Sequence, residues 1–351
     1  MIVGGEFVFS PKIFLQPNLG QFSSYGKELA QYKRYYTFGA YYSLLALLHN
    51  IKTGAGEYVL LPSYLCPTII EPFRKRGIHY DFYKMTEGLR ADLADIARKT
   101  KPGLIAILFI DYFGFPQKEF LADTVAQLRS KDVKILQDTV QAWLDNEAEL
   151  YGDYCFNSVR KYSPFEASVL LAREELGHLA RTSISLQYLW HKRYGQLLRY
   201  YHLSQDRFKP ETFLKHIDKA NELYHQPGIV KLPWHNKWAL DRLDFAAMGR
   251  ERKAVYRHLK GGLQPRLILG DRKEDVAPLG MAVYLEDRDL KKAKLHSMDI
   301  HCPLHWRLPQ EIDKHEHEYS WDLEEHALTL PINVKLDQLE KYTNKLREVL
   351  T

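Results

Sequence analysis

Two ionisable side chains, Asp138 and Lys161, each follow a predicted buried strand. Asp138 ends the apolar segment VKILQD, and Lys161 lies just beyond the next segment, YCFNSV. A lysine amine can form a Schiff base with pyridoxal phosphate, and a carboxylate facing the pyridine nitrogen keeps it protonated, so that the ring accepts the electron pair of a broken Cα–H bond. The pattern suggests Lys161 as the Schiff-base lysine and Asp138 as the partner of the pyridine nitrogen.

A glycine turn at Gly39, Ala40 and Tyr41 opens the apolar stretch 40–50, whose length and Leu and Ala content favour a buried helix. The N–H groups at a helix N-terminus have no intrahelical partner, and the helix dipole attracts negative charge there. These three residues are therefore candidate ligands of the cofactor phosphate. The hydroxyl of Ser158 is a further candidate.

Each assignment has a structural alternative. An acid at the end of a buried strand is often the N-cap of the next helix, which would make Asp138 a cap. Lys161 adjoins Arg160, and a Lys–Arg pair usually lies on a solvated face. The combination of Asp138, Gln141 one helical turn later and Lys161 after the next strand supports a cofactor site, but by itself it leaves the structural alternatives open.

Apolar strands alternate with helices along residues 35–172. The helices are expected at 67–76, 91–100 and 118–130, and the strands are YVLLP, IHYDFY, LIAILFI, VKILQD, YCFNSV and SVLLA. Continuous apolar strands between helices indicate a mostly parallel sheet that is covered on both faces and binds ligands at the carboxyl ends of its strands.

The pattern changes after residue 173. Residues 174–225 look helical and are rich in Tyr, His, Lys and Arg, a second helical stretch covers 238–260, and the segments PRLILG, MAVYLE, HCPLHW and ALTLPI then precede a final helix. We therefore expect a large domain, 1–240, with a helical basic-aromatic segment at 174–235, and a smaller C-terminal α+β domain, 241–351.

Composition excludes several classes of protein. The 351 residues are 45% hydrophobic and 26% charged, which is ordinary globular usage, and the formal net charge of +5 is weak support for nucleic-acid binding. The three cysteines are too far apart for a disulfide framework or a CxxC metal site. The apolar stretches are too short to span a bilayer, and the first residues lack a signal-peptide pattern. We expect a cytoplasmic protein that binds neither membranes nor nucleic acid.

Five motifs, in this order, carry a resemblance to a known family. They are TFGAYYSLLAL, GAGEYVLLPSYLCPT, DYFGFPQ, ILQDTVQAW and GDYCFNSVRKYSPFEASVLL. Together with HCPLHWRLP and LTLPINVKLDQLEKYTNKL near the end, they resemble the DegT/DnrJ/EryC1/StrS family of pyridoxal-phosphate-dependent sugar aminotransferases. The resemblance implies an α/β fold of the aspartate-aminotransferase type (PLP fold type I), with a large domain built on a mixed, mostly parallel sheet and a smaller α+β domain.

The same resemblance assigns roles to residues. It implies that Lys161 binds the cofactor and shuttles the proton, that Asp138 contacts the pyridine nitrogen, and that Gln141 lies near the phenolic oxygen. The turn from Gly39 to Tyr41 matches the phosphate-binding turn. At Cys66, many members have an aromatic ring over the cofactor, so either Cys66 packs on the ring or the neighbouring Tyr64 or Tyr112 does.

The implied reaction moves an amino group from an amino acid, which we take to be glutamate, to a carbonyl acceptor, a sugar or nucleotide-sugar intermediate. The family also implies a homodimer with active sites shared between subunits. One departure lies after the lysine, where Phe165-Glu166-Ala167-Ser168 replaces an acidic-glycine stretch and adds Cβ atoms. The alternative is therefore a non-catalytic or regulatory protein that keeps the fold but has lost turnover.

Three other motifs compete with this interpretation. His315, His317 and His326 with nearby acids could suggest a metal, but DKHEHEYSW is typical of a solvated loop, and we expect no metal site. The sequence Gly54-Ala55-Gly56 precedes a strand and predicts a turn. The basic-aromatic stretch 188–208 is explained by a surface helix with apolar stems and charged tips, or it lines the substrate entrance.

Overall fold

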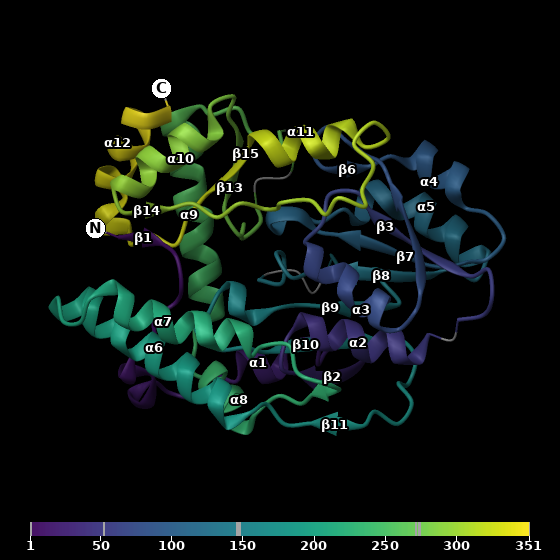
Figure 1. Ribbon diagram of the computed structural model, residues 1–351, viewed down its shortest axis with the longest axis horizontal. Coiled ribbons are helices and arrows are strands. Elements are labelled where there is room, and N and C mark those ends of the chain that lie inside the picture. The colour runs from purple at the N-terminus through teal and green to yellow at the C-terminus, as the bar shows by residue number, and fades with distance from the viewer. Residues whose placement is uncertain (1, 52, 145–148, 271, 273–274, 351) are drawn as a thin grey trace. The chain divides into compact units, whose positions relative to one another are not determined.

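The computed structural model describes residues 2–51, 53–144, 149–270, 272 and 275–350 (Figure 1). The chain forms two compact units. Unit 1 comprises residues 1–5, 51–155 and 246–351, and unit 2 comprises residues 6–50 and 156–245. The expected domain boundary near residue 240 stays a prediction.

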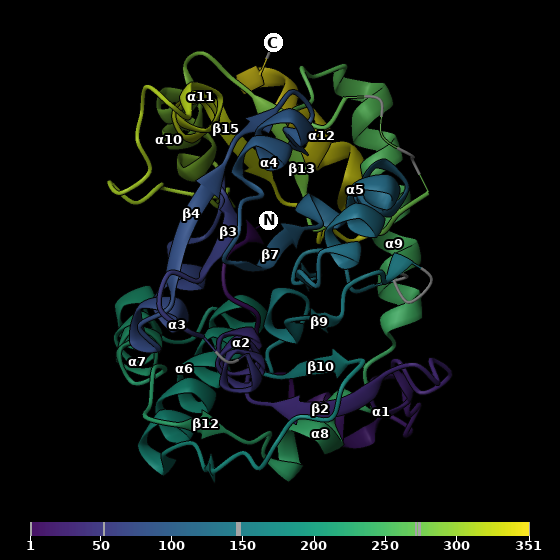
Figure 2. The same ribbon diagram turned by 90° about the vertical axis from the view of Figure 1, so that its right-hand side faces the viewer.

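Unit 1 contains a parallel sheet in the order β8-β7-β3-β4. These strands are β3 (Tyr58–Pro62), β4 (His79–Tyr83), β7 (Leu104–Ile110) and β8 (Lys134–Asp138). Figure 2 shows β4, β3 and β7 side by side. The inner strands are buried along almost their whole length, which is why their sequences are continuous apolar runs rather than alternating ones.

The helices between these strands are α3 (Ile70–Lys75), α4 (Leu93–Lys99) and α5 (Lys118–Ser130). Helix α5 packs on β8, and α3 and α4 pack on β4. Gly77 ends the α3 segment with a φ of 65°, the left-handed conformation that favours glycine after a helix. The side chain of Asp92 caps α4 by accepting from the N–H of Asp95.

Asp95 itself is a buried carboxylate in α4. It accepts hydrogen bonds from the N–H of Lys84 at 2.9 Å and from the guanidinium of Arg98 at 2.5 Å. Burial alone raises the pKa of Asp95, but these hydrogen bonds and the positive charges nearby outweigh it, so the pKa lies below its usual value. The charged form of Asp95 therefore stabilises the folded state.

Strand β4 lies at the edge of the unit 1 sheet, and side chains occupy the backbone groups of Phe82. The carboxylate of Asp81 accepts from the Phe82 N–H at 2.7 Å, and the buried Lys99 ammonium donates to the Phe82 carbonyl at 2.5 Å. Lys99 also pairs with Glu316 at 2.9 Å. Both main-chain hydrogen-bonding groups of Phe82 are thus satisfied without a further strand.

The C-terminal part of unit 1 is smaller and mixed. Its helices are α9 (Phe245–Leu263), whose first residue still belongs to unit 2, α10 (Arg288–Ser297), α11 (Glu318–His326) and α12 (Leu339–Leu350). Its strands are β13 (Met281–Tyr284), β14 (Ile300–His301) and β15 (Ala327–Leu330). Strands β13 and β15 are antiparallel, and β1 (Val3–Gly4) runs parallel to β14. Two predicted strands are wrong. PRLILG has only a bridge at Leu267, and HCPLHW is a strand only at His301, because Pro303 breaks the pairing.

Unit 2 is built around β2 (Lys33–Thr37), antiparallel to β10 (Ser168–Ala172), and around α2 (Ala40–Asn50). Helices α6 (Leu186–Gln205) and α7 (Pro210–Glu222) lie side by side, α8 covers Trp234–Leu240, and α1 covers Gln21–Ser24 (Figure 1). The predicted helical segment thus begins at residue 186. Its first residues include β11 (Arg181–Thr182), which pairs with β12 (Ile229–Val230).

Strand β9 (Tyr154–Phe156) contains the point where the chain passes from unit 1 to unit 2. It is shorter than the predicted YCFNSV strand, because residues 159–161 form a 3-10 helix. None of the described helices combines the length and the apolar composition needed to cross a membrane.

Candidate active site

Asp138 lies at the carboxyl end of β8 and is 4% exposed. Its Oδ1 accepts from the N–H of Val140 at 2.8 Å, and its carbonyl accepts from the N–H of Asp111, which follows β7, at 3.0 Å. Asp138 therefore supports the turn that follows its strand, and residues 140–142 form a turn rather than the helix that the capping alternative requires. It also places a buried carboxylate at the edge of a parallel sheet where ligands bind in such folds.

Gln141 is also buried and fixes the turn after β7. Its Oε1 accepts from the N–H of Phe113 at 2.7 Å. Phe113 has a φ of 55°, an unusual conformation for a non-glycine residue, which this hydrogen bond helps to hold. Gln141 thereby connects the segment after β8 with the segment that carries Tyr112.

Tyr64 and Tyr112 are the two aromatic alternatives for packing on a cofactor ring, and unit 1 brings them together. Their ring centroids are 6.0 Å apart, and the Tyr112 hydroxyl donates to the Tyr64 carbonyl at 2.5 Å. Burial, with the charges of Tyr83, Tyr64 and Asp138 adding to it, raises the pKa of Tyr112, so its hydroxyl stays protonated. Cys66 is half-buried, and its Sγ lies 3.1 Å from the Thr68 hydroxyl.

In unit 2, Gly39 precedes α2, and Ala40 and Tyr41 are the first residues of that helix. The hydroxyl of Thr37 donates to the Gly39 carbonyl at 3.0 Å. A row of hydroxyls continues from Thr37 through Ser43 to Ser168 with oxygen separations of 2.8 Å. The last residue of the 165–168 departure is therefore bonded to α2, so its serine has a defined structural role.

Lys161 ends the 3-10 helix Val159–Lys161 and is half-buried. The buried Ser158 precedes this helix, and its carbonyl accepts from the Lys161 N–H at 3.4 Å. The N–H of Val159 donates to the carbonyl of Ala167 at 2.9 Å, which closes the segment between them into a loop. Lys161 thus lies on a short, anchored loop.

Arg193 of α6 contacts residues 164–166 of this loop. Its guanidinium donates to the Pro164 carbonyl at 2.6 Å, lies 3.3 Å from the Glu166 carboxylate and sits 4.6 Å from the centre of the Phe165 ring. Asn236 donates to the Glu166 carbonyl at 2.7 Å. The Phe165-Glu166 departure is therefore matched by Arg193 of the basic-aromatic helix α6 and by Asn236 of α8.

The sequence did not reveal Arg193 as the partner of Glu166. Glu166 is 2% exposed, and buried carboxylates are paired because an isolated buried charge is unstable. An acid inside the apolar segment after Lys161 could have signalled a distant cationic partner. Nothing local indicates which cation of 188–208 that partner is.

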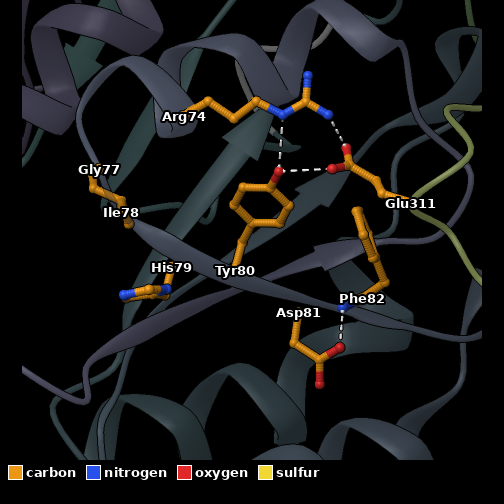
Figure 3. A pocket seen from close by; sticks show the side chains of 8 residues that line it. All are labelled: Arg74, Gly77, Ile78, His79, Tyr80, Asp81, Phe82 and Glu311. Carbon is orange, nitrogen blue, oxygen red and sulfur yellow. Dashed lines mark hydrogen bonds and ion pairs between the residues drawn. The ribbon is translucent and has the colours of Figure 1, made fainter.

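A separate pocket of about 550 Å³ lies beside β4 and contains none of the predicted site residues (Figure 3). Arg74, Tyr80 and Glu311 close a ring there: Arg74 lies 3.1 Å from the Tyr80 hydroxyl and 2.7 Å from Glu311, and Tyr80 donates to Glu311 at 2.9 Å. These polar groups satisfy one another. Within the described ranges, no group of three or more metal-ligating side chains is found.

No protein-family model matches the chain, and no curated protein matches its sequence. Solved structures do match it over nearly its whole length. A DegT DnrJ EryC1 StrS aminotransferase from Brucella abortus is 14% identical, with a TM-score of 0.64 and coverage of 98% of this chain and 91% of that chain. PseC of Helicobacter pylori, an aminotransferase involved in the biosynthesis of pseudoaminic acid, is 12% identical, with a TM-score of 0.68 and coverage of 100% and 99%.

A third structure, NtdA of Bacillus subtilis with bound cofactor PMP, is 13% identical, with a TM-score of 0.63 and coverage of 99% and 78%. At these identities the likeness concerns the fold. The predicted fold class, an α/β fold of the aspartate-aminotransferase type, is therefore confirmed.

Proposed function

We propose that this protein is a pyridoxal-phosphate-dependent aminotransferase of the DegT/DnrJ/EryC1/StrS type. The observation that carries the proposal is the buried carboxylate of Asp138 at the carboxyl end of β8, in a chain with the fold of known aminotransferases. Lys161 on its anchored loop supplies the amine that such an enzyme needs.

The chemistry of the described residues fits the cofactor. The N-terminus of α2 offers backbone N–H donors, and because Gly39 has no Cβ, the Tyr224 hydroxyl can approach the start of the helix closely. Ser158 adds a hydroxyl, and Asp138 adds the carboxylate that a pyridinium nitrogen requires. When bound, pyridoxal phosphate supplies an aldehyde for amines and a ring that accepts electrons.

The chain's own residues then have defined tasks. The Asp138 carboxylate holds the proton on the pyridine nitrogen, because a negative charge there favours the protonated ring. Once its Nζ is released, Lys161 takes the proton from the donor Cα as a general base and returns a proton as a general acid. Gln141 keeps the turn after β7 in place, and Tyr64 or Tyr112 packs on the cofactor ring.

The substrates follow from the kind of enzyme. We propose glutamate as the amino donor and the carbonyl of a sugar or nucleotide sugar as the acceptor. The similar structure of PseC supports a sugar-type acceptor, since PseC is an aminotransferase involved in the biosynthesis of pseudoaminic acid. We further propose a cytoplasmic homodimer with shared active sites and with domains 1–240 and 241–351.

The alternative, a non-catalytic protein, rested on the departure at 165–168. The bonds of Glu166 to Arg193 and of Ser168 to Ser43 anchor that segment, which fits both alternatives because both keep the fold. The chain retains both Asp138 and Lys161, however, and a protein without turnover has no reason to keep both. We therefore keep the catalytic proposal.

The test is the absorption spectrum of the purified protein during titration with pyridoxal phosphate. A visible-violet band should form with the parent protein, should be lost in Lys161→Ala, and should disappear when glutamate is added without an acceptor. Lys27→Ala, on an exposed residue of unit 2, is the matched control and should keep the band. Without a Lys161-dependent band the cofactor assignment fails. A band that no amino donor changes would instead favour the non-catalytic alternative.

A further inference from the structure

The hydroxyl of Tyr224 faces the N-terminus of α2 in unit 2. Tyr224 follows α7 and is 6% exposed. If Gly39 carried a Cβ, that atom would overlap the Tyr224 hydroxyl oxygen, which shows how closely the hydroxyl approaches the start of the helix. In the part of the chain that the structure describes, this hydroxyl has no hydrogen-bond partner.

A hydroxyl that a largely buried side chain leaves without a protein partner is completed by a ligand or by water. The rings of Phe38, Tyr42 and Tyr188 surround Tyr224, with centroids 5.9, 5.9 and 6.1 Å away, so the side chain has little freedom to turn toward another partner. Burial raises the pKa of Tyr224, which keeps the phenol protonated and able to donate. The hydroxyl is therefore a fixed donor beside the N–H groups of α2.

Arg160 adds positive charge to the same place. Its guanidinium carbon lies 4.9 Å from the centre of the Tyr224 ring, and its charge opposes the rise in the pKa of Tyr224. The carboxylate of Glu166 raises the pKa of Tyr224, and Glu166 is itself contacted by Arg193 at 3.3 Å and by Lys192 at 3.9 Å. The Tyr224 side chain thus contacts both the start of α2 and the Arg160 guanidinium.

We propose that Tyr224 and Arg160 bind the phosphate group of the cofactor, with the Tyr224 hydroxyl donating a hydrogen bond and the Arg160 guanidinium balancing the charge. This inference rests on the proposed function and extends the predicted set of phosphate ligands. It also gives Arg160 a task other than solvation. The ligand chemistry is that of a phosphate monoester at a helix N-terminus.

The experiment compares two probes that differ by the phosphate group, pyridoxal 5′-phosphate and pyridoxal. Tyr224→Phe and Arg160→Gln should each weaken the binding of pyridoxal 5′-phosphate about tenfold or more, because a hydrogen bond or charge contact to an ion is lost. Both variants should bind pyridoxal within about twofold of the parent protein. Equal weakening of both probes, or unchanged binding of pyridoxal 5′-phosphate, would overturn the proposal.

Matched controls exist in the same unit. Arg173 lies 5.5 Å from the centre of the Tyr32 ring, and the Tyr36 hydroxyl donates to the Ser23 carbonyl at 3.3 Å. Arg173→Gln and Tyr36→Phe remove the same groups away from α2 and should leave the binding of both probes unchanged. Circular dichroism of each variant checks that the fold is retained.

A second measurement separates this inference from the proposed function. Inorganic phosphate should raise the melting temperature of the parent protein and of Lys161→Ala, but should raise that of Tyr224→Phe and Arg160→Gln much less. If no Lys161-dependent band forms but this pattern holds, the cofactor assignment fails and the phosphate site stands. If the band forms but both probes bind the variants as they bind the parent protein, the phosphate assignment fails alone.

Discussion

Replacing Gly39 with alanine tests the packing at the start of α2. The φ of Gly39 is not in the left-handed region, so the penalty is steric. The new Cβ would lie closer than 3.0 Å to the Tyr224 hydroxyl oxygen, whereas the next nearest atom, Tyr224 Cζ, is 3.4 Å away. Because aromatic rings surround Tyr224, relief requires small movements of several side chains. We expect Gly39→Ala to lower the free energy of unfolding by about 1–3 kcal/mol.

Removing the hydroxyl should remove most of that penalty. In Tyr224→Phe the closest ring atom to the Cβ is 3.4 Å away, which is an ordinary van der Waals contact. The double variant Gly39→Ala/Tyr224→Phe should therefore be about 1–2 kcal/mol more stable than the sum of the single changes predicts.

Urea unfolding followed by circular dichroism measures these free energies, with equal m-values as the condition for comparing variants. Gly261→Ala is the control, because a Cβ at that position in α9 meets nothing within 4 Å. It should stabilise the protein by about 0.5–1 kcal/mol through helix propensity. If the double variant at Gly39 and Tyr224 is additive within about 0.3 kcal/mol, the overlap argument is wrong.

Two further predictions concern buried carboxylates. Asp138→Asn should still bind pyridoxal phosphate but transaminate at least about 100-fold more slowly, since a neutral amide no longer keeps the ring protonated. Single-turnover rates with an amino donor measure this effect. Rates within a few-fold of those of the parent protein would mean that Asp138 only supports the turn after its strand. Because the pKa of Asp95 is lowered by folding, its contribution to stability is present above its unfolded pKa of about 3.9 and is lost as the pH falls through its folded pKa. The urea midpoint of the parent protein should thus fall more steeply below about pH 5 than that of Asp95→Asn, and parallel profiles would contradict the assignment.

The sequence predicted elements well where burial is continuous or where helix signals agree. The helix expected at 118–130 is α5, Lys118–Ser130, and the strand YVLLP is β3, Tyr58–Pro62. Segments whose pairing depends on distant partners were less predictable. HCPLHW looks like a strand by composition, but only two residues of β14 find a partner, in β1 at the other end of the chain.

The candidate site likewise contains residues with a local sequence signal and residues whose contacts depend on distant partners. Gly39, Asp138 and Lys161 could be proposed as site residues because their chemistry is tied to local features, a turn before a helix or the end of a strand. Tyr224 and Arg193 were not assigned roles, since each contacts its partner across a long stretch of sequence. A tyrosine among 23 and a basic residue among 49 carry no local mark of such contacts.

The arrangement around Phe82 bears on how the protein behaves at high concentration. An edge strand normally presents a row of free N–H and C=O groups that a strand of another molecule can use as a template for aggregation. On β4, the Asp81 carboxylate and the Lys99 ammonium already occupy both groups of Phe82. An incoming chain would have to displace two charged side chains to continue the ladder past this residue. At this residue the edge is thus protected against pairing with another molecule by charged side chains, one of which comes from the neighbouring helix α4.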